Sequence, residues 1–164
     1  MKTIYNIFQE LGITYKLYEH PPFYTCEEST AWYAANICED LGGESKNLFL
    51  RNKKGDRHFL VVVESNKRMD MKELASRLGE SGVSFASPER LKRYLNLTPG
   101  SVSVLALIYE GARDIPVIFD EDLLRHDKLH YHPPGRNDQT LLLTTDDLKK
   151  FLAWVSNSVT FMKF

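Results

Sequence analysis

Two β-rich runs joined by a short polar connection constrain the fold of this chain more than any other feature. Residues 46–52 (KNLFLRN) and 57–64 (RHFLVVVE) flank the four residues Lys53-Lys54-Gly55-Asp56. Glycine in such a connection allows the positive φ that a tight turn requires. The pattern predicts an antiparallel hairpin, and a sheet that contains a hairpin cannot be purely parallel.

Helices and further strands follow one another along the chain without strict alternation. At the N-terminus, for example, Ile4, Ile7, Phe8 and Leu11 recur at helical spacing on one apolar face. The irregular order argues against a doubly wound or barrel fold. We therefore predict one α/β domain over residues 1–164, with a mixed β-sheet and flanking helices. Helices are expected at 4–11, 26–40, 71–78, 89–96 and 146–156, strands at 14–19, 83–86, 102–109, 117–119, 128–132 and 140–143, and a short tail at the end.

The composition is that of a globular protein from a reducing compartment. The chain has 164 residues, of which 43% are hydrophobic and 26% charged. A chain of this size can bury roughly 70% of its unfolded surface, so its core needs no metal or disulfide. Cys26 and Cys38 follow no secretory leader, and no apolar run approaches the roughly 20 residues that cross a bilayer. We expect a cytoplasmic protein with buried structural thiols and no membrane partner.

The motifs of several large enzyme classes are absent. The chain has no GxSxG, GxGxxG, GxxxxGK[ST] or HExxH sequence. The two cysteines match no zinc spacing. His130 and His132 alternate on the predicted strand 128–132, so they share a face and could bind a metal with a third ligand. Because no such ligand is evident, we expect no metal or cofactor, and histidines that form hydrogen bonds or contact phosphate.

Positive charge gathers on and beside the predicted hairpin. Residues 44–72 contain eight Lys or Arg and four Asp or Glu, although the net charge of the whole chain is −1. That overall charge excludes a highly basic protein that coats nucleic acid, and we expect no DNA partner. One interpretation is a solvated hairpin tip. The other is a surface on which Arg51, Lys53 and Lys54 contact the phosphates of a folded RNA.

Lys46 differs from the lysines at the tip. It begins an apolar strand directly after the Gly42-Gly43 joint, where its amine could project into a cleft. An ammonium group that is partly removed from water can hold a phosphate or stabilise a developing oxyanion. The neighbouring Asn47 can both donate and accept hydrogen bonds. Either residue could instead be a polar residue at a strand edge.

Three ordered motifs are similar to those of one family. These motifs are Ser45-Lys46-Asn47-Leu48-Phe49-Leu50, Pro99-Gly100-Ser101-Val102-Ser103 and Tyr131-His132-Pro133. In this order and at these separations they resemble the free-standing prolyl-tRNA editing proteins of the YbaK/ProX group, and also the editing domain inserted in bacterial prolyl-tRNA synthetases. The likeness runs almost from end to end, and within the group it is greatest to the alanyl-tRNA(Pro) deacylases.

The resemblance implies a tRNA partner and hydrolysis of the ester that joins a wrong amino acid, typically alanine, to proline tRNA. It assigns catalytic roles to Lys46 and His132, with Lys46 on the terminal phosphate or ribose and His132 on the 3′-terminal nucleotide. Asn47 would orient the ester, and the backbone of Gly100 and Ser101 would line the aminoacyl pocket. Such an ester is already activated, so a positioned water suffices and no covalent intermediate is needed.

The sequence departs from the family at one position of the pocket loop. The proline that ends the family's GxxxP loop is Val104 here. Removal of cysteine or serine is therefore an alternative to removal of alanine, and a non-catalytic tRNA-binding module is another. The absence of a long exposed apolar helix favours a monomer.

Overall fold

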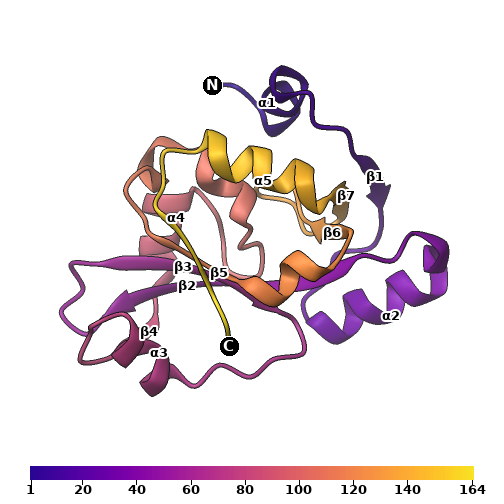
Figure 1. Cartoon of the computed structure of the whole chain (residues 1–164). Helices are drawn as coiled ribbons and strands as arrows, with labels where there is room; N and C mark the ends of the chain where they lie inside the picture. Colours follow the sequence, from indigo (N-terminus) through magenta and orange to yellow (C-terminus); the bar gives the residue numbers. More distant parts are fainter.

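The predicted hairpin lies at the centre of an eight-stranded sheet in the computed structural model, which describes residues 1–164 (Figure 1). β2 (Gly43–Asn52) and β3 (His58–Glu64) pair antiparallel. The strand order is β1-β7-β6-β2-β3-β5-β8, and the short β4 also pairs with β2. β2 with β6, β3 with β5 and β5 with β8 are parallel pairs, so the prediction of a mixed sheet is confirmed. The other strands are β1 (Lys16–Glu19), β4 (Val83–Phe85), β5 (Val117–Asp120), β6 (Lys128–Tyr131), β7 (Gln139–Thr144) and β8 (Val159–Met162).

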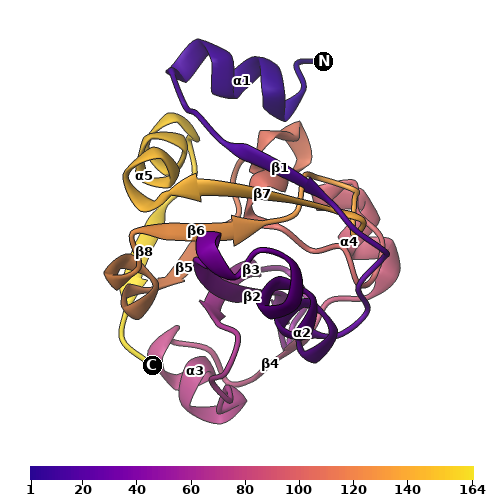
Figure 2. The same ribbon diagram turned by 90° about the vertical axis from the view of Figure 1, so that its right-hand side faces the viewer.

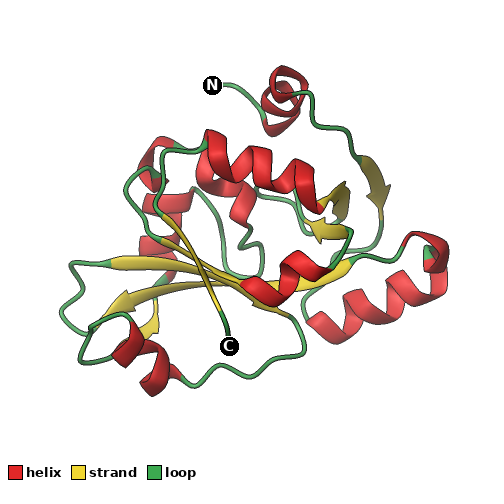
Figure 3. Cartoon of the chain, in the orientation of Figure 1, coloured by secondary structure: helices red, strands yellow, loops and turns green.

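Five α-helices flank the sheet. Figure 3 shows the helical segments in red around the yellow strands. Their starts follow the capping residues of the sequence: the Thr25 hydroxyl accepts the backbone N–H of Glu28, and the Ser87 hydroxyl accepts that of Arg90. α4 and α5 lie on one side of the β2–β3 hairpin and α3 on the other (Figures 1 and 2). The helices are α1 (Ile4–Leu11), α2 (Cys26–Asn36), α3 (Met71–Arg77), α4 (Pro88–Leu95) and α5 (Thr145–Trp154).

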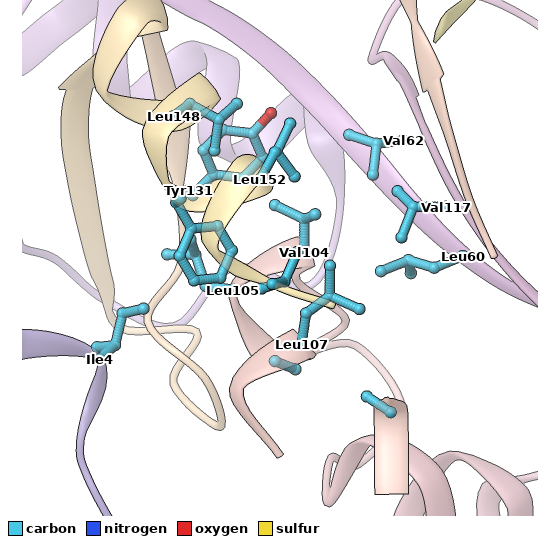
Figure 4. Close-up of a cluster of buried hydrophobic side chains, with 14 of the residues drawn as sticks. Ile4, Leu60, Val62, Val104, Leu105, Leu107, Val117, Tyr131, Leu148 and Leu152 are labelled. Carbon is cyan, nitrogen blue, oxygen red and sulfur yellow. The ribbon is translucent and has the colours of Figure 1, made fainter. Parts of the chain in front are cut away.

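Alternate residues of β3 enter two different apolar clusters. Leu60 and Val62 pack in the main core of 27 buried residues, which also contains Leu148 and Leu152 of α5 (Figure 4). Val61, from the opposite face of the strand, joins a smaller cluster with α3. Each such aliphatic side chain contributes about 1.5–3 kcal/mol to the stability of the fold when buried. The hairpin is therefore covered by apolar side chains on both faces.

Two predicted segments have a different structure. The apolar run 102–109 is not a strand: residues Val104–Ile108 form a 3-10 helix that is buried in the core. A short, continuously apolar run fits a buried strand or a buried helical turn equally well, so its periodicity could not decide between them. The predicted C-terminal tail contains β8, which pairs in parallel with β5 at the edge of the sheet.

The predicted helix 26–40 is divided. α2 ends at Asn36, and a separate 3-10 turn covers Cys38–Asp40. The Gly42-Gly43 pair that follows is a site of close packing rather than a flexible joint, since a Cβ atom on Gly42 would lie 2.6 Å from the carbonyl oxygen of Lys128. Only glycine lets β2 come this near to β6.

None of the helices is both long enough and apolar enough to cross a membrane.

Candidate active site

An open cavity of about 220 Å³ lies where β2 meets the start of α2 and two loops. We call it the outer cavity. It brings together segments that are far apart in the sequence: the loop before α2, the first half of β2, the loop after α4 and the residue that follows β6. Its lining residues are Phe23, Tyr24, Thr25, Cys26, Ser29, Ser45, Lys46, Asn47, Gly100, Val102 and His132.

A smaller, more polar cavity of about 40 Å³ adjoins it, which we call the inner cavity. The two share Ser29, Ser45, Asn47, Val102 and His132. The inner cavity adds Tyr33, Glu44, His130 and Tyr131 to its lining. Four residues predicted for the site, Lys46, Asn47, Gly100 and His132, thus line one continuous depression.

Lys46 lies at the cavity end of β2. Successive side chains of a strand point to opposite faces, so Lys46 and Asn47 leave β2 in opposite directions, and both reach the outer cavity. The Lys46 ammonium donates a hydrogen bond to the backbone carbonyl of Lys67. Its positive charge also acts on the thiol of Cys26 across the cavity. A cation is therefore held beside the opening by the backbone.

Asn47 connects β2 to the loop that follows α4. Its Oδ1 accepts a hydrogen bond from the backbone N–H of Val104 at 3.0 Å. A proline at position 104, as in the family's loop, has no N–H and could not donate this bond. The departure at Val104 therefore gives this chain a direct link between Asn47 and the pocket loop, which leaves the Asn47 NH₂ group nearest to Ser45 Oγ, at 3.4 Å.

Gly100 and Ser101 differ in what they can offer a ligand. Gly100 has a φ of 85° and no protein atom within 4 Å of where a Cβ would lie, so its backbone faces open space. Ser101 is buried and does not line either cavity. Its N–H and its hydroxyl both donate to the Thr98 carbonyl, at 3.2 and 2.8 Å. Of these two predicted pocket residues, only Gly100 therefore lies at a cavity wall.

His132 directs one ring nitrogen toward the cavities. Its Nδ1 donates to the Gln139 carbonyl at 2.7 Å, which leaves Nε2 as the unprotonated nitrogen of the neutral ring. Burial lowers the pKa of His132 below its usual value, so the ring is neutral at neutral pH. Nε2 has no protein partner and is available to accept a proton or hydrogen bond from a ligand.

His130 and Tyr131 place two unpartnered polar atoms in the inner cavity. The Gly42 N–H lies 3.1 Å from His130 Nε2 and the Asp40 carbonyl oxygen lies 3.5 Å from the same nitrogen, whereas Nδ1 has no partner. Burial lowers the pKa of His130 to about 4. The Tyr131 hydroxyl is likewise buried without a hydrogen-bond partner, although the Ser45 side chain lies near enough to lower its pKa. β6 ends at Tyr131, so His132 lies beyond the strand on which it was predicted to alternate with His130.

Glu44 adds a carboxylate to the inner cavity. Its Oε2 accepts hydrogen bonds from the hydroxyls of Ser29 and Thr30 on α2, each at 3.1 Å. Burial raises the pKa of Glu44 above its usual value. No sequence motif indicates a role for Glu44. Its position at the cavity depends on hydrogen bonds to α2, which the sequence does not reveal.

Two further lining residues were missed for the same reason. Tyr24 lines the outer cavity and is 75% exposed, whereas Phe23 is buried and stacks on His20 with ring centroids 3.9 Å apart. In the sequence, the only indication of a role in the site is that a tyrosine directly precedes the capping Thr25, and this indication is weak.

The cysteines are not the buried thiols that we expected: Cys26 is half-buried in the outer cavity wall and Cys38 is exposed. Burial raises the pKa of the Cys26 thiol, which disfavours the nucleophilic thiolate. No three His, Cys, Asp or Glu side chains gather in a metal-binding arrangement.

The Lys and Arg side chains near the hairpin differ in whether an acidic side chain already pairs with them. Lys67 pairs with Asp120 at 2.9 Å and with Asp122 at 2.6 Å, and Arg57 pairs with Glu80. Lys53 is exposed without an ion pair, Lys54 is exposed beside Asp56, and Arg51 is half-buried. Lys53 is seven residues from Lys46 along the hairpin, so the tip lies about 23 Å from the cavities.

Comparisons with known proteins agree on one family. The family profile described as "Aminoacyl-tRNA editing domain" matches residues 20–151. The prolyl-tRNA editing protein ProX of Acetoanaerobium sticklandii is 38% identical over 143 residues, which cover 87% of this chain and 84% of that protein. The prolyl-tRNA synthetase associated domain-containing protein 1 of Danio rerio is 30% identical over 99% of this chain and 86% of its own. The crystal structure of hypothetical protein APE2540 shares the fold, with a TM-score of 0.71, 20% identity and 98% coverage of both chains.

Proposed function

This chain belongs to the aminoacyl-tRNA editing domain family and is an aminoacyl-tRNA deacylase, and from this premise we propose that it removes alanine from mischarged proline tRNA. The observation that carries the proposal is the single cavity that Lys46, Asn47, Gly100 and His132 line together. The relative named as a prolyl-tRNA editing protein supports the choice of proline tRNA. A tRNA substrate also favours the cytoplasm as the place of action.

The outer cavity is suited to the 3′-terminal nucleotide. Lys46 would hold the terminal phosphate or ribose through its charge. The exposed ring of Tyr24 offers a face on which a base can stack, an interaction worth about 1–3 kcal/mol. The open backbone at Gly100 lets the ester approach the wall of the cavity. Together these contacts would place the ester at the entrance of the inner cavity.

His132 would act on the ester end of the substrate. Its neutral Nε2 can accept a hydrogen bond from a ribose hydroxyl or from the attacking water, and the bond from Nδ1 to Gln139 fixes the ring. The substrate's own 2′-hydroxyl would help to organise that water. Burial raises the pKa of the Cys26 thiol and so disfavours a thiolate nucleophile, which supports a reaction without a covalent intermediate.

The size of the inner cavity favours alanine over proline. A synthetase pocket built for proline cannot strongly reject a smaller side chain, because a missing methylene is worth only about 1–3 kcal/mol. A second pocket that is too small for proline removes this error. The inner cavity is small, at about 40 Å³, and is walled by Tyr33 of α2, which supports a preference for alanine.

Deacylation assays test the proposal directly. The protein is incubated with Ala-, Cys-, Ser- and Pro-tRNA(Pro), each labelled on the amino acid, and release is followed. Hydrolysis of Ala-tRNA(Pro) with sparing of Pro-tRNA(Pro) is expected. Preferred hydrolysis of the cysteinyl or seryl ester would support the alternative substrates, and binding without turnover would support the tRNA-binding module. A monomer is expected in sedimentation of the free protein.

A further inference from the structure

The Glu44 carboxylate is partly buried without a cation beside it. Its pKa is raised by burial and lowered only by the hydroxyls of Thr30 and Ser29, with no lysine, arginine or histidine among the groups that act on it. The nearby Lys46 ammonium bonds instead to the Lys67 carbonyl. A carboxylate removed from water usually has a cationic partner, so the inner cavity has an unmet preference for positive charge.

One oxygen of this carboxylate is free. Both hydroxyl bonds from α2 end on Oε2, whereas Oε1 has no protein partner. Because the hydroxyls of Ser29 and Thr30 hold the side chain, its free oxygen keeps a constant position at the cavity wall. It is thus a pre-positioned acceptor.

Two neighbouring groups indicate that the inner cavity receives a polar ligand. His130 is 5% exposed and Tyr131 is 3% exposed, and each has a polar atom without a partner. Buried polar atoms are nearly always hydrogen-bonded in folded proteins, to protein, water or ligand. The Tyr131 hydroxyl can accept a hydrogen bond as well as donate one. A small cationic donor would therefore find two acceptors here, Glu44 Oε1 and Tyr131 Oη.

We propose that the Glu44 carboxylate binds the α-ammonium group of the aminoacyl ester and thereby selects esters whose amino group is unblocked. This inference rests on the proposed function, since it assumes that the ester enters from the outer cavity. The α-ammonium is attached to the carbon next to the ester carbonyl, so it arrives at the inner cavity with the reacting group. An N-acylated ester has neither the charge nor the three donors, and its added acyl group is too large for the space.

Binding of stable analogues tests the role of Glu44 without catalysis. The probes are 3′-alanylamino-3′-deoxyadenosine, in which an amide replaces the ester, and its N-acetyl form, each measured by calorimetry at about pH 6.5, where an α-amino group is charged. The proteins are wild type, Glu44→Gln and the matched control Glu39→Gln. Glu39 is exposed in the turn after α2, so this control removes the same charge away from the cavity.

Wild type and Glu39→Gln should bind the free-amine analogue at least about tenfold more tightly than the acetylated one, the ratio expected for a charge-assisted hydrogen bond. Glu44→Gln should reduce this ratio to near one. Its amide oxygen can still accept the hydroxyls of Ser29 and Thr30, so the fold is retained, and thermal unfolding checks this. A wild-type ratio near one, an unchanged ratio in Glu44→Gln, or no binding of the free-amine analogue would overturn the proposal.

Deacylation separates this inference from the proposed function. Wild type should hydrolyse Ala-tRNA(Pro) much faster than N-acetyl-Ala-tRNA(Pro). The ratio of these two rates should be smaller in Glu44→Gln. If no aminoacyl-tRNA(Pro) is hydrolysed while the analogue ratio depends on Glu44, the proposed function fails and the binding site stands. If Ala-tRNA(Pro) is hydrolysed but wild type and Glu44→Gln discriminate equally against N-acetyl-Ala-tRNA(Pro), the proposed function stands and the role of Glu44 fails.

Discussion

The two ends of β2 carry similar residues in different surroundings. At one end, beside α2, Lys46 is half-buried and bonded to backbone at the edge of the outer cavity. Beyond the other end, Lys53 and Lys54 are exposed in the hairpin turn, and Figure 1 shows this turn at the opposite end of β2 from α2. An exposed lysine attracts a ligand mainly through a long-range electrostatic field, which salt screens. An enclosed lysine instead contacts the ligand at a defined position. Lysines of the same charge can therefore contribute differently to ligand binding, because their surroundings differ.

The largest expected effect is that of Lys46→Ala. Deacylation of Ala-tRNA(Pro) should fall by at least about tenfold, because the positioned charge is removed, while the thermal midpoint changes little. Single-turnover rates and thermal unfolding measure the two effects. Lys53→Ala is the matched control at the tip and should retain most of the activity. Equal reductions in both variants would remove the distinction between the two ends of β2.

Asn47→Ala should lower both activity and stability. The variant leaves the buried N–H of Val104 without its acceptor, which costs about 1–3 kcal/mol of unfolding free energy. Asn47→Asp keeps an oxygen that can accept this bond, so it should recover much of the stability. Urea unfolding of the two variants distinguishes them. Equal stability of Asn47→Ala and wild type would show that the link to the pocket loop does not support the fold.

The pH dependence should reflect the enclosed histidines. Burial lowers the pKa of His132, and that of His130 to about 4, so the unfolded chain binds more protons than the folded one as pH falls. Stability is therefore highest above the ordinary histidine pKa of about 6.5 and declines as pH falls toward 4. The rate should decline over the acidic part of this range as His132 Nε2 becomes protonated. A kcat/KM profile for wild type and His132→Asn checks this, and an acid limb that survives in the variant would contradict the role of His132.

The smallest effect is expected from charge reversal at the tip. Lys53→Glu with Lys54→Glu should weaken tRNA affinity and reduce the slope of log affinity against log salt by about 1 for each phosphate that is no longer neutralised. The choice of amino acid should not change, because the cavities lie at the other end of β2. Filter binding over a range of salt concentrations gives the slope. An unchanged slope would assign these lysines to a solvated tip.

Much of the fold could be predicted because its signals are local. The capping residues Thr25 and Ser87 start the helices that they predicted, and the run around Gly55 forms the hairpin. The apolar run 102–109 was predicted wrongly, since both a buried strand and a buried helical turn would produce it. β8 was missed because its residues form a strand only through pairing with β5.

The candidate site was predictable in part. Motifs pointed to Lys46, Asn47, Gly100 and His132, and the fold brings them to one cavity. Ser101 lies outside both cavities with its backbone N–H bonded within its own turn, which no motif reveals. Glu44 and Tyr24 lacked any motif and were found only through the cavities that they line.

By itself, the amino-acid sequence determined the hairpin, the helix starts, the mixed sheet and the motifs of an editing family, because these depend on neighbouring residues and on the order of short segments. Only the tertiary structure decided which cations are enclosed and which are exposed, which hydrogen-bonding groups are already occupied, and that the Glu44 carboxylate lacks a cation. The physical reason is that burial and pairing depend on contacts between residues distant in the chain, such as Asn47 with Val104 and Lys67 with Asp120.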